Sequence, residues 1–379
     1  MRRLFALLAF VLLATNQHVP ADEIVLKQGE RERKITGKVL VTAEDGGIIA
    51  LAPDGRIWPI RPAELVSHKP GGPEFVPLNH QQLIAELKQE LPAGFRFHET
   101  KHYLICYNTS DAYAQWCGGL FERLYGAFTN YWTEREMPLV EPTFPMIAVV
   151  FSDRESFANY SRAELGDAVS AIIGYYSFRS NHMTMYDLTG IEALRKPGDK
   201  GKTADINQFL SQPQAERTVA TIIHEATHQI AHNCGLQTRY ASNPMWVSEG
   251  MALYFETPDL KSRKGWRNIG AVNQFQMGNF QKYLARRPAG ALATIITDDK
   301  AFRDAQKSAD AYAESWALTY FLMRARPKQY QEYLTMLSKK EVAAWDTAET
   351  RLTEFKKTFG ELSGFEEDYL RFMRKVRSN

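Results

Sequence analysis

The sequence has little of several features that mark particular classes of protein. Its 46 Lys and Arg residues barely outnumber its 44 Asp and Glu residues, so it lacks the basic excess that nucleic-acid binding requires. Of its three cysteines, Cys106 and Cys117 could pair, but we favour small core positions for both, without a disulfide framework. There is no internal repeat and no low-complexity tract. The composition, 44% hydrophobic and 24% charged, is typical of a globular protein and predicts no nucleic-acid partner.

An apolar run near the N-terminus is too short to cross a bilayer as a helix. It extends from Leu4 to Ala14, follows two arginines, and leads to Val19-Pro20-Ala21, which has the small residues that a signal peptidase recognises. We therefore expect residues 1–21 to be a cleaved signal peptide, with an uncleaved anchor as the alternative. The expected location is secreted or periplasmic, with no membrane span after cleavage.

Strand and helix patterns predict an α+β fold that ends in an all-helical part. Residues 22–70 alternate apolar and polar positions between turn signals, as in a small SH3-like β module. Residues 71–95 are typical of a linker with a short helix. The remaining domain, 96–379, divides into an α+β lobe at 96–234 and a helical lobe at 235–379. The β module is either a structural appendage or a docking site for an unknown partner.

Within the main domain, individual elements follow from hydrophobic periodicity. Strands are expected at HYLICYN (102–108) and PMIAVVFSD (145–153), the second continuous enough for a sheet interior. GYYSFRSNHMTMYDL (174–188) predicts a pair of strands or one long bent strand. Helices are expected from about Ala112 to Arg135 and around Glu155–Glu164. The polar loop 190–212 either flanks a cleft or is an ordinary surface loop.

The stretch TIIHEATHQIAHNC (221–234) contains an H-E-x-x-H motif on a predicted helix. Its apolar stripe comprises Val219, Ile222, Ile223, Ala226 and Ile230. His224 and His228 lie on nearly the opposite side, about 6 Å apart, a spacing that one zinc ion can bridge. Glu225 is then placed to take a proton from zinc-bound water. The alternative is a pair of solvated histidines on a surface helix.

Two nearby residues that could also bind a metal, His232 and Cys234, are expected to pack in the protein instead. His232 lies a further turn along the helix, about 6 Å from the site. Cys234 could supply a thiolate ligand, but no turn brings it back toward the two histidines. We therefore favour packing roles for both.

The stretch NPMWVSEGMALYFE (243–256) offers a better third ligand. We expect Asn243 to cap a helix that Pro244 opens. Its apolar face comprises Met245, Trp246, Ala252 and Leu253. Glu249 falls in the middle of that face, where a carboxylate is costly to bury unless a cation meets it. A salt-bridged core glutamate is the alternative. Because Glu249 follows the histidine motif in the chain, we favour a metal ligand.

HEATH followed by WVSEGMALYFE resembles the gluzincin branch of the zincin metallopeptidases, H-E-x-x-H…W-x-x-E-G-x-A. Most of the chain is similar to secreted gluzincin-like proteins of unassigned function. The resemblance implies a zincin fold and one zinc ion per chain, held by His224, His228 and Glu249, with Glu225 as general base and acid. It also implies that the 174–188 segment is an edge strand where an extended peptide can add.

A tyrosine is expected to assist the reaction by stabilising an oxyanion. AYAESWALTYFL (311–322) resembles the Y-E-x-G-x-x-L helix of aminopeptidases, which implies this role for Tyr312. Ser315 replaces the glycine of that pattern. Tyr254 and Tyr186 are alternatives, and all three could instead be aromatic core residues.

These observations predict a secreted zinc metallopeptidase acting on peptide or protein substrates. The G-x-M-E-N segment by which aminopeptidases hold a free N-terminus is missing, which favours an endopeptidase. The chief alternative is a catalytically inactive zincin-fold binding or scaffold protein that retains zinc. A third interpretation is a metal-free helical scaffold.

Overall fold

The computed structural model describes residues 20–189, 206, 216–257 and 269–377. Residues 1–19 of the predicted signal peptide, and nearly all of the 190–212 loop, lie outside the described residues. The chain divides into two compact units, taken from residues 1–53 with 58–77 and from 54–57 with 78–379. Within the described residues, no helix combines the length and the hydropathy that crossing a bilayer requires.

The first unit is a five-stranded sheet in the order β4-β3-β2-β1-β5. Its strands are β1 (Asp22–Gln28), β2 (Arg31–Thr42), β3 (Ile48–Leu51), β4 (Ile57–Ile60) and β5 (Leu65–Lys69). β1 pairs antiparallel with both β2 and β5, and Ile24 lies opposite Ile35. Alternate apolar side chains form a small core that includes Ile24, Ile48, Trp58 and Ile60. The alternation seen in the sequence therefore places one face of this sheet inward.

The second unit begins with helix α1 (His80–Glu90) and a mixed sheet in the order β6-β7-β8-β10-β9. The strands are β6 (Arg96–Glu99), β7 (Tyr103–Tyr107), β8 (Met146–Phe151), β9 (Gly174–Tyr176) and β10 (His182–Tyr186). β7, β8 and β10 run parallel, whereas β6 and β9 are antiparallel edge strands. The 174–188 segment is thus a pair of strands, one of the two predicted arrangements.

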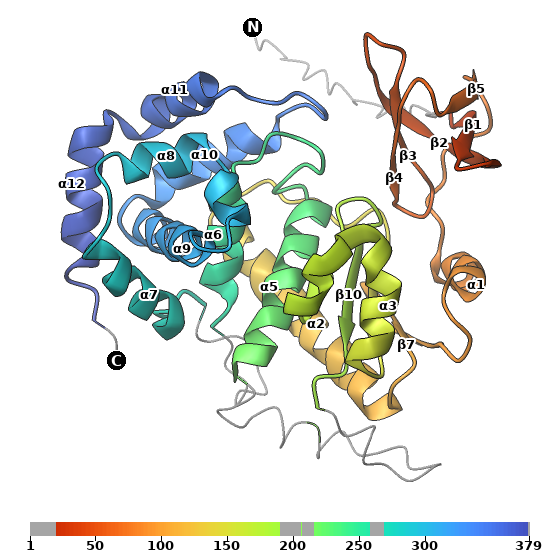
Figure 1. Cartoon of the computed structure of the whole chain (residues 1–379), viewed down its shortest axis with the longest axis horizontal. Coiled ribbons are helices and arrows are strands. Elements are labelled where there is room, and N and C mark those ends of the chain that lie inside the picture. The colour runs from red at the N-terminus through yellow and green to blue at the C-terminus, as the bar shows by residue number, and fades with distance from the viewer. Residues whose placement is uncertain (1–19, 190–205, 207–215, 258–268, 378–379) are drawn as a thin grey trace, which may run out of the picture. The chain divides into compact units, whose positions relative to one another are not determined.

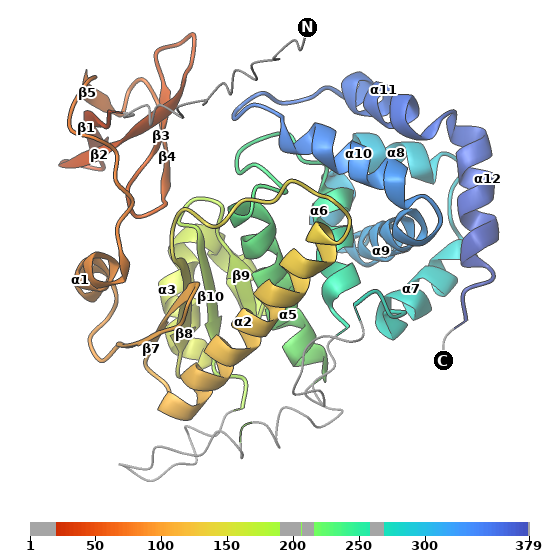
Figure 2. The ribbon, with the colours of Figure 1, turned by 180° about the vertical axis from the view of Figure 1, so that it is seen from behind.

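Helices cover both faces of this sheet, which explains its continuous apolar strands. Along β7, Tyr103 and Ile105 face α2 (Asp111–Thr133) and α5 (Glu216–Asn233), whereas Leu104 and Cys106 face α1 and α3 (Arg154–Leu165). In both ribbon views α2 and α5 lie on the same side of the strands (Figure 1, Figure 2). All three cysteines are buried and free, which confirms the core positions predicted for Cys106 and Cys117.

Among the described residues after α5, the regular elements are helices, as predicted. The helices are α6 (Met245–Phe255), α7 (Gln274–Leu284), α8 (Ala291–Thr297), α9 (Ser308–Ala325), α10 (Pro327–Ser338), α11 (Ala348–Phe359) and α12 (Leu362–Met373), with a short 3-10 turn η4 (Lys300–Arg303). Another 3-10 turn, η1 (Gly166–Ala171), follows α3. The mixed α+β composition with helices at the C-terminal end confirms the coarse fold class.

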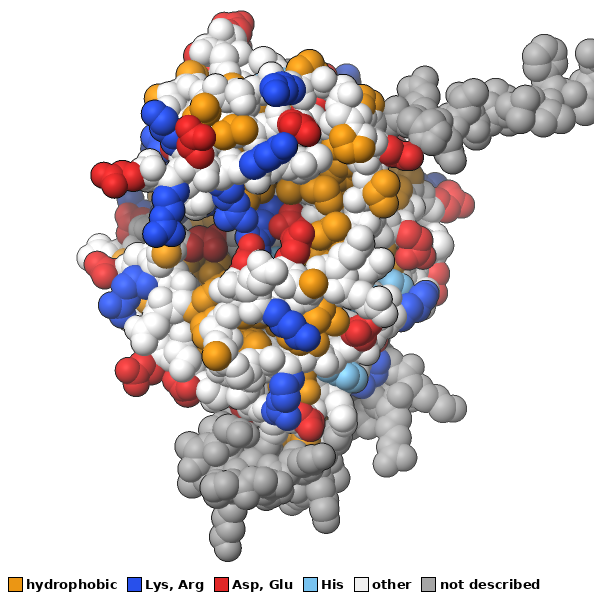
Figure 3. Space-filling view, turned by 90° about the vertical axis from the view of Figure 1, so that its right-hand side faces the viewer, with side chains coloured by type: hydrophobic (Ala, Val, Ile, Leu, Met, Phe, Trp, Pro, Cys, Tyr) orange, Lys and Arg blue, Asp and Glu red, His pale blue; other side chains and the backbone are white. Residues whose placement is uncertain are grey.

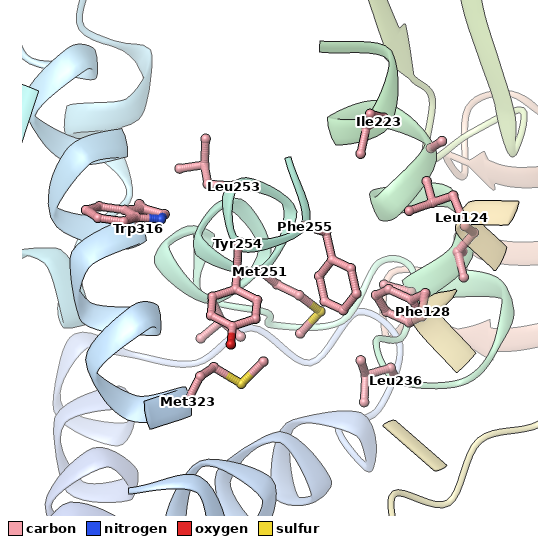
Figure 4. Packing of buried hydrophobic residues seen from close by; sticks show 14 of the residues in the cluster. Leu124, Phe128, Ile223, Leu236, Met251, Leu253, Tyr254, Phe255, Trp316 and Met323 are labelled. Atoms are coloured by element: carbon pink, nitrogen blue, oxygen red, sulfur yellow. The ribbon is translucent and has the colours of Figure 1, made fainter. Parts of the chain in front are cut away.

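Helix α6 is buried on nearly every side: Trp246, Ala252 and Leu253 of the predicted apolar face are buried, and so are residues outside that face. Figure 4 shows Phe255 directed toward Phe128 of α2, with Trp316 of α9 on the opposite side of α6. The rings of Phe255 and Phe128 are 4.7 Å apart between centroids. The helix is enclosed because α5 and α9 both pack against it. Leu253 and Tyr254 are therefore buried as well.

The start of α6 also differs from the prediction. Pro244 occupies the N-cap position, and the Asn243 side chain bonds the carbonyl groups of Thr238 and Ala241 rather than capping the helix. The first helical amide, that of Met245, donates instead to a carboxylate oxygen of Asp299 at 3.0 Å. Because this cap comes from a residue far along the chain, no local pattern could have indicated it.

Gly250 lets α6 and α9 approach closely. A Cβ atom built at this position would lie 2.5 Å from the backbone oxygen of Ser315 and even closer to the Thr319 hydroxyl. The backbone oxygen cannot rotate away, so any larger residue forces the helices apart. Since Gly250 directly follows Glu249, this close contact lies one residue from the carboxylate.

We expect Gly250→Ala to lower the free energy of unfolding by about 1–3 kcal/mol, because overpacking outweighs the gain of up to about 1 kcal/mol in helix propensity. The measurement is urea unfolding followed by circular dichroism. Gly126→Ala on α2 is the matched control, since its added Cβ would meet no atom within 4 Å. Equal stability of the two variants would contradict the close-packing argument.

The surface carries both signs of charge. On the face shown in Figure 3, Lys and Arg side chains are interspersed with Asp and Glu side chains rather than gathered in one broad patch. This distribution agrees with the near balance of 46 basic and 44 acidic residues.

Candidate metal centre

Helix α5 carries the two histidines of the motif on a buried face. The predicted stripe of Val219, Ile222, Ile223, Ala226 and Ile230 is buried, which confirms how the helix is oriented. His224 and His228 are each only 8% exposed although they lie on the other side of the helix. They are covered because α6 packs against that side.

Three ligand atoms meet between α5 and α6. His224 Nε2 lies 3.0 Å from Glu249 Oε2 and 3.1 Å from His228 Nε2. His228 Nε2 lies 3.6 Å from the same Glu249 oxygen. Among the described residues, these three side chains are the group of metal-ligating type that could hold an ion. The structure therefore brings together the three residues that were predicted as ligands.

The proton positions around this group indicate a cation. His224 Nδ1 lies 2.7 Å from Glu256 Oε1, and only a protonated Nδ1 can donate to a carboxylate. Neutral His224 therefore directs the Nε2 lone pair at Glu249 and His228. Burial by itself would lower the pKa of His224, but hydrogen bonds to Glu249 and Glu256 outweigh this effect and raise the pKa above its ordinary value. In the neutral imidazole the Nε2 lone pair faces a carboxylate oxygen, an arrangement that a cation would favour, and two imidazole nitrogens with one carboxylate oxygen suit zinc.

Glu256 and Asn273 form a second layer behind His224. Glu256, at the C-terminal end of α6, accepts a hydrogen bond from Asn273 Nδ2 at 3.1 Å as well as the one from His224. Such outer partners fix the tautomer and the orientation of a ligating histidine. Sequence analysis missed this role. The position of Glu256, two helical turns after Glu249, was the one signal available.

Glu225 is held beside the ligands by the edge strand. Its Oε2 accepts a hydrogen bond of 2.8 Å from the backbone amide of Tyr176 in β9. Burial raises the pKa of the Glu225 carboxyl. The side chain lines the cavity described below rather than pointing into the core. This carboxylate is therefore positioned to exchange protons with a group bound in the cavity.

The three candidate tyrosines lie in different places. The ring of Tyr312 on α9 is 6.4 Å from that of His224, and the side chain lines the same cavity. Burial, together with the nearby Glu249 carboxylate, raises the pKa of Tyr312, so its hydroxyl stays protonated. The Tyr254 hydroxyl is 3.2 Å from that of Tyr131 within the core. Tyr186 packs on Phe157. Only Tyr312 of these three reaches the site.

A cavity of about 470 Å³ opens beside the ligands. Its volume is within the range of sites that hold small molecules or peptide side chains. The histidine and glutamate ligands line it together with Glu225, Tyr312 and His232. His232 stacks on Tyr176 with ring centroids 5.7 Å apart, and Cys234 is buried with its thiol toward the Ala231 carbonyl. Both pack as predicted, although His232 also forms part of the cavity wall.

Comparison with known protein families gives a match over part of the chain. A family model described as a protein of unknown function (DUF1570) matches residues 218–343. The matched region contains the three ligand residues, Glu225 and Tyr312. No curated protein matches the chain.

Proposed function

We propose that the chain is a zinc-dependent endopeptidase of the gluzincin type. One observation carries this proposal: the ligand atoms of His224, His228 and Glu249 converge in the wall of a cavity, with the Glu225 carboxylate beside them. A purely structural metal site would have no need of an adjacent carboxylate and an open space. Sites in which zinc is catalytic keep such a position open.

The proposal includes a zincin fold for the second unit and an SH3-like fold for the first. A mixed sheet with an antiparallel edge strand, a histidine helix under it and a helical part beyond it support the zincin fold. The small five-stranded sheet supports the SH3-like fold. A secreted or periplasmic location after removal of residues 1–21 belongs to the same proposal.

The proposed chemistry assigns a role to each residue of the site. Zinc, when bound by the three ligands, would acidify a coordinated water and polarise a peptide carbonyl. Glu225 would take the proton of the attacking water and deliver it to the leaving amine. Its buried position keeps the pKa of this carboxyl above the ordinary value, which favours return of the proton. Tyr312, which stays protonated, would donate a hydrogen bond to the oxygen that gains charge.

The substrate would bind as an extended strand along β9. This strand pairs with β10 on one side and forms the edge of the sheet on the other. An extended peptide can add to such an edge through main-chain hydrogen bonds. The outward amide of Tyr176 already bonds Glu225, so the peptide would use the neighbouring outward groups.

A mixed peptide library tests the function. Residues 22–379, loaded with one zinc ion per chain, are expected to cleave peptides at internal bonds, and a chelator should stop the reaction. Mass spectrometry of the products identifies the bonds. Intact peptides in the presence of fully loaded protein would overturn the peptidase and favour a binding protein that retains zinc.

We expect Tyr312→Phe to lower kcat by about 10²–10³-fold, the effect typical of removing one donor to an oxyanion. KM and zinc content should change little, because the hydroxyl acts on developing charge rather than on the ground state. Steady-state kinetics on a peptide from the library measure this. Tyr254→Phe is the control, since its hydroxyl contacts Tyr131 away from the cavity. Equal activity of both variants would exclude Tyr312 from the reaction.

A further inference from the structure

Two exposed aromatic side chains lie at the cavity that contains the metal centre. Phe178 is 47% exposed and Trp345 is 67% exposed, and both line this cavity. Exposed aromatic rings of this size are few among the described residues. Exposure at the wall of a binding cavity, rather than at scattered surface positions, indicates contact with a ligand.

Phe178 is held in place by the turn between β9 and β10. Its ring lies 5.0 Å from the ring of His232 and 5.5 Å from that of Tyr176. The Tyr176 hydroxyl donates to Asn181 Oδ1 at 2.7 Å, and Asn181 Nδ2 donates to Asn233 Oδ1 at 2.9 Å. Asn233 is the last residue of α5, so these bonds fasten the turn to the histidine helix.

Trp345 lies on the connection between α10 and α11, which is fastened on both sides of it. The amide of Ala343 donates to the Tyr240 carbonyl at 2.7 Å, and the amide of Asp346 donates to Ser242 Oγ at 3.1 Å. The backbone that carries the indole is therefore held at the cavity. A rigid aromatic side chain loses little conformational entropy when a ligand contacts it.

The distance from the metal centre indicates which part of a substrate would reach these rings. His232 follows His228 by one helical turn, about 6 Å along α5. An extended peptide advances about 3.3 Å per residue, so His232, which Phe178 contacts, lies about two residues of peptide from His228. Phe178 follows β9 by two positions, and a peptide paired with this edge strand would pass in front of it.

We propose that Tyr176, Phe178, His232 and Trp345 form a subsite for an aromatic or large aliphatic side chain, located within about two residues of the cleaved bond. This inference rests on the proposed peptidase function and names its substrate class. Aromatic and aliphatic side chains fit because the rings supply apolar area and offer edges and faces for aromatic stacking.

The test compares peptides that differ at single positions near the cleaved bond. For the zinc-loaded protein, kcat/KM should be at least about 10-fold higher with Phe or Leu than with Ala or Glu at one of these positions. Phe178→Ser and Trp345→Ser should each reduce the ratio of kcat/KM for the Phe or Leu peptide to that for the Ala peptide several-fold. Phe275→Ser is the matched control, because Phe275 is exposed to a similar extent (45%) but does not line the cavity.

A binding measurement separates this inference from the peptidase function. The same peptides are titrated by fluorescence anisotropy against zinc-loaded Glu225→Gln protein, with and without Phe178→Ser. Cleavage without a side-chain preference, or a preference that both cavity variants retain, would overturn the subsite and leave the peptidase standing. Side-chain-selective binding that Phe178→Ser weakens, without cleavage by the parent protein, would support the subsite and overturn the peptidase. Oligosaccharides are titrated in the same way. If one binds more tightly than every peptide, the assignment of a peptide side chain to the subsite is overturned.

Discussion

In the Glu249→Ala variant, the affinity for zinc is expected to fall by more than the roughly 10- to 100-fold typical of changes outside the ligand set. The variant keeps only His224 and His228, one turn apart on α5, whereas catalytic zinc sites have three protein ligands. The measurement is metal content by mass spectrometry of residues 22–379, followed by competition with a chelator of known affinity.

Two further variants make this prediction specific. Glu256→Ala removes the partner of His224 Nδ1 and should cost about 10- to 100-fold in zinc affinity, less than Glu249→Ala. Ser248→Ala changes a cavity-lining neighbour of Glu249 and should leave the affinity unchanged. Zinc that binds Glu249→Ala as tightly as the parent would require another third ligand, with Cys234 the first to examine. A parent protein that takes up no zinc after reconstitution would exclude the metal centre.

Replacing Glu225 with Gln is expected to lower kcat for peptide cleavage by about 10²–10⁴-fold while zinc content stays at the parent level. The amide cannot accept the proton of the attacking water. Its oxygen can still accept the hydrogen bond from the Tyr176 amide, so the local structure should persist. Cleavage of a peptide from the library is followed by mass spectrometry, with the metal content of the same samples determined in parallel.

Glu164→Gln is the matched control for this variant. Glu164 accepts hydrogen bonds from Ser177 and Tyr175 next to the same edge strand but does not line the cavity. Its activity should stay within about twofold of the parent, as is usual for changes away from a site. Full activity of Glu225→Gln would require a different base. Loss of zinc in that variant would instead make Glu225 a ligand.

The parts of the fold that local periodicity governs were predictable from sequence. The apolar stripe along α5 was predictable because residues that recur with the helical period lie on the same side of the helix, and this side is buried. The continuous apolar run of β8 identified a strand covered on both faces. The two histidine ligands were predictable because an i, i+4 pair has only one geometry on a helix, and Glu249 because a carboxylate within an apolar face requires a cation. The three ligand atoms come together only because α6 packs against α5. The motif indicates this packing only through the resemblance to gluzincins.

The features that could not be predicted all depend on residues distant in sequence. Asp299 caps α6, and Arg351 bonds Asp299 in turn at 2.8 Å. Asn273 supports Glu256 across the gap between α6 and α7. The burial of α6 extends beyond its predicted apolar face, because helices from distant parts of the chain enclose it. Each of these contacts forms only once the helical part has packed.

The bond between the Tyr176 amide and Glu225 has a consequence for how substrates would be distinguished. The strand that would align a peptide is the same strand that holds the carboxylate in place. A peptide paired out of register would tilt this strand and shift the carboxylate with it, and a displacement of about 1 Å can cost 10²-fold in rate. A wrong substrate would then bind nearly as well as a right one and turn over far more slowly, so that discrimination would appear in kcat rather than in affinity.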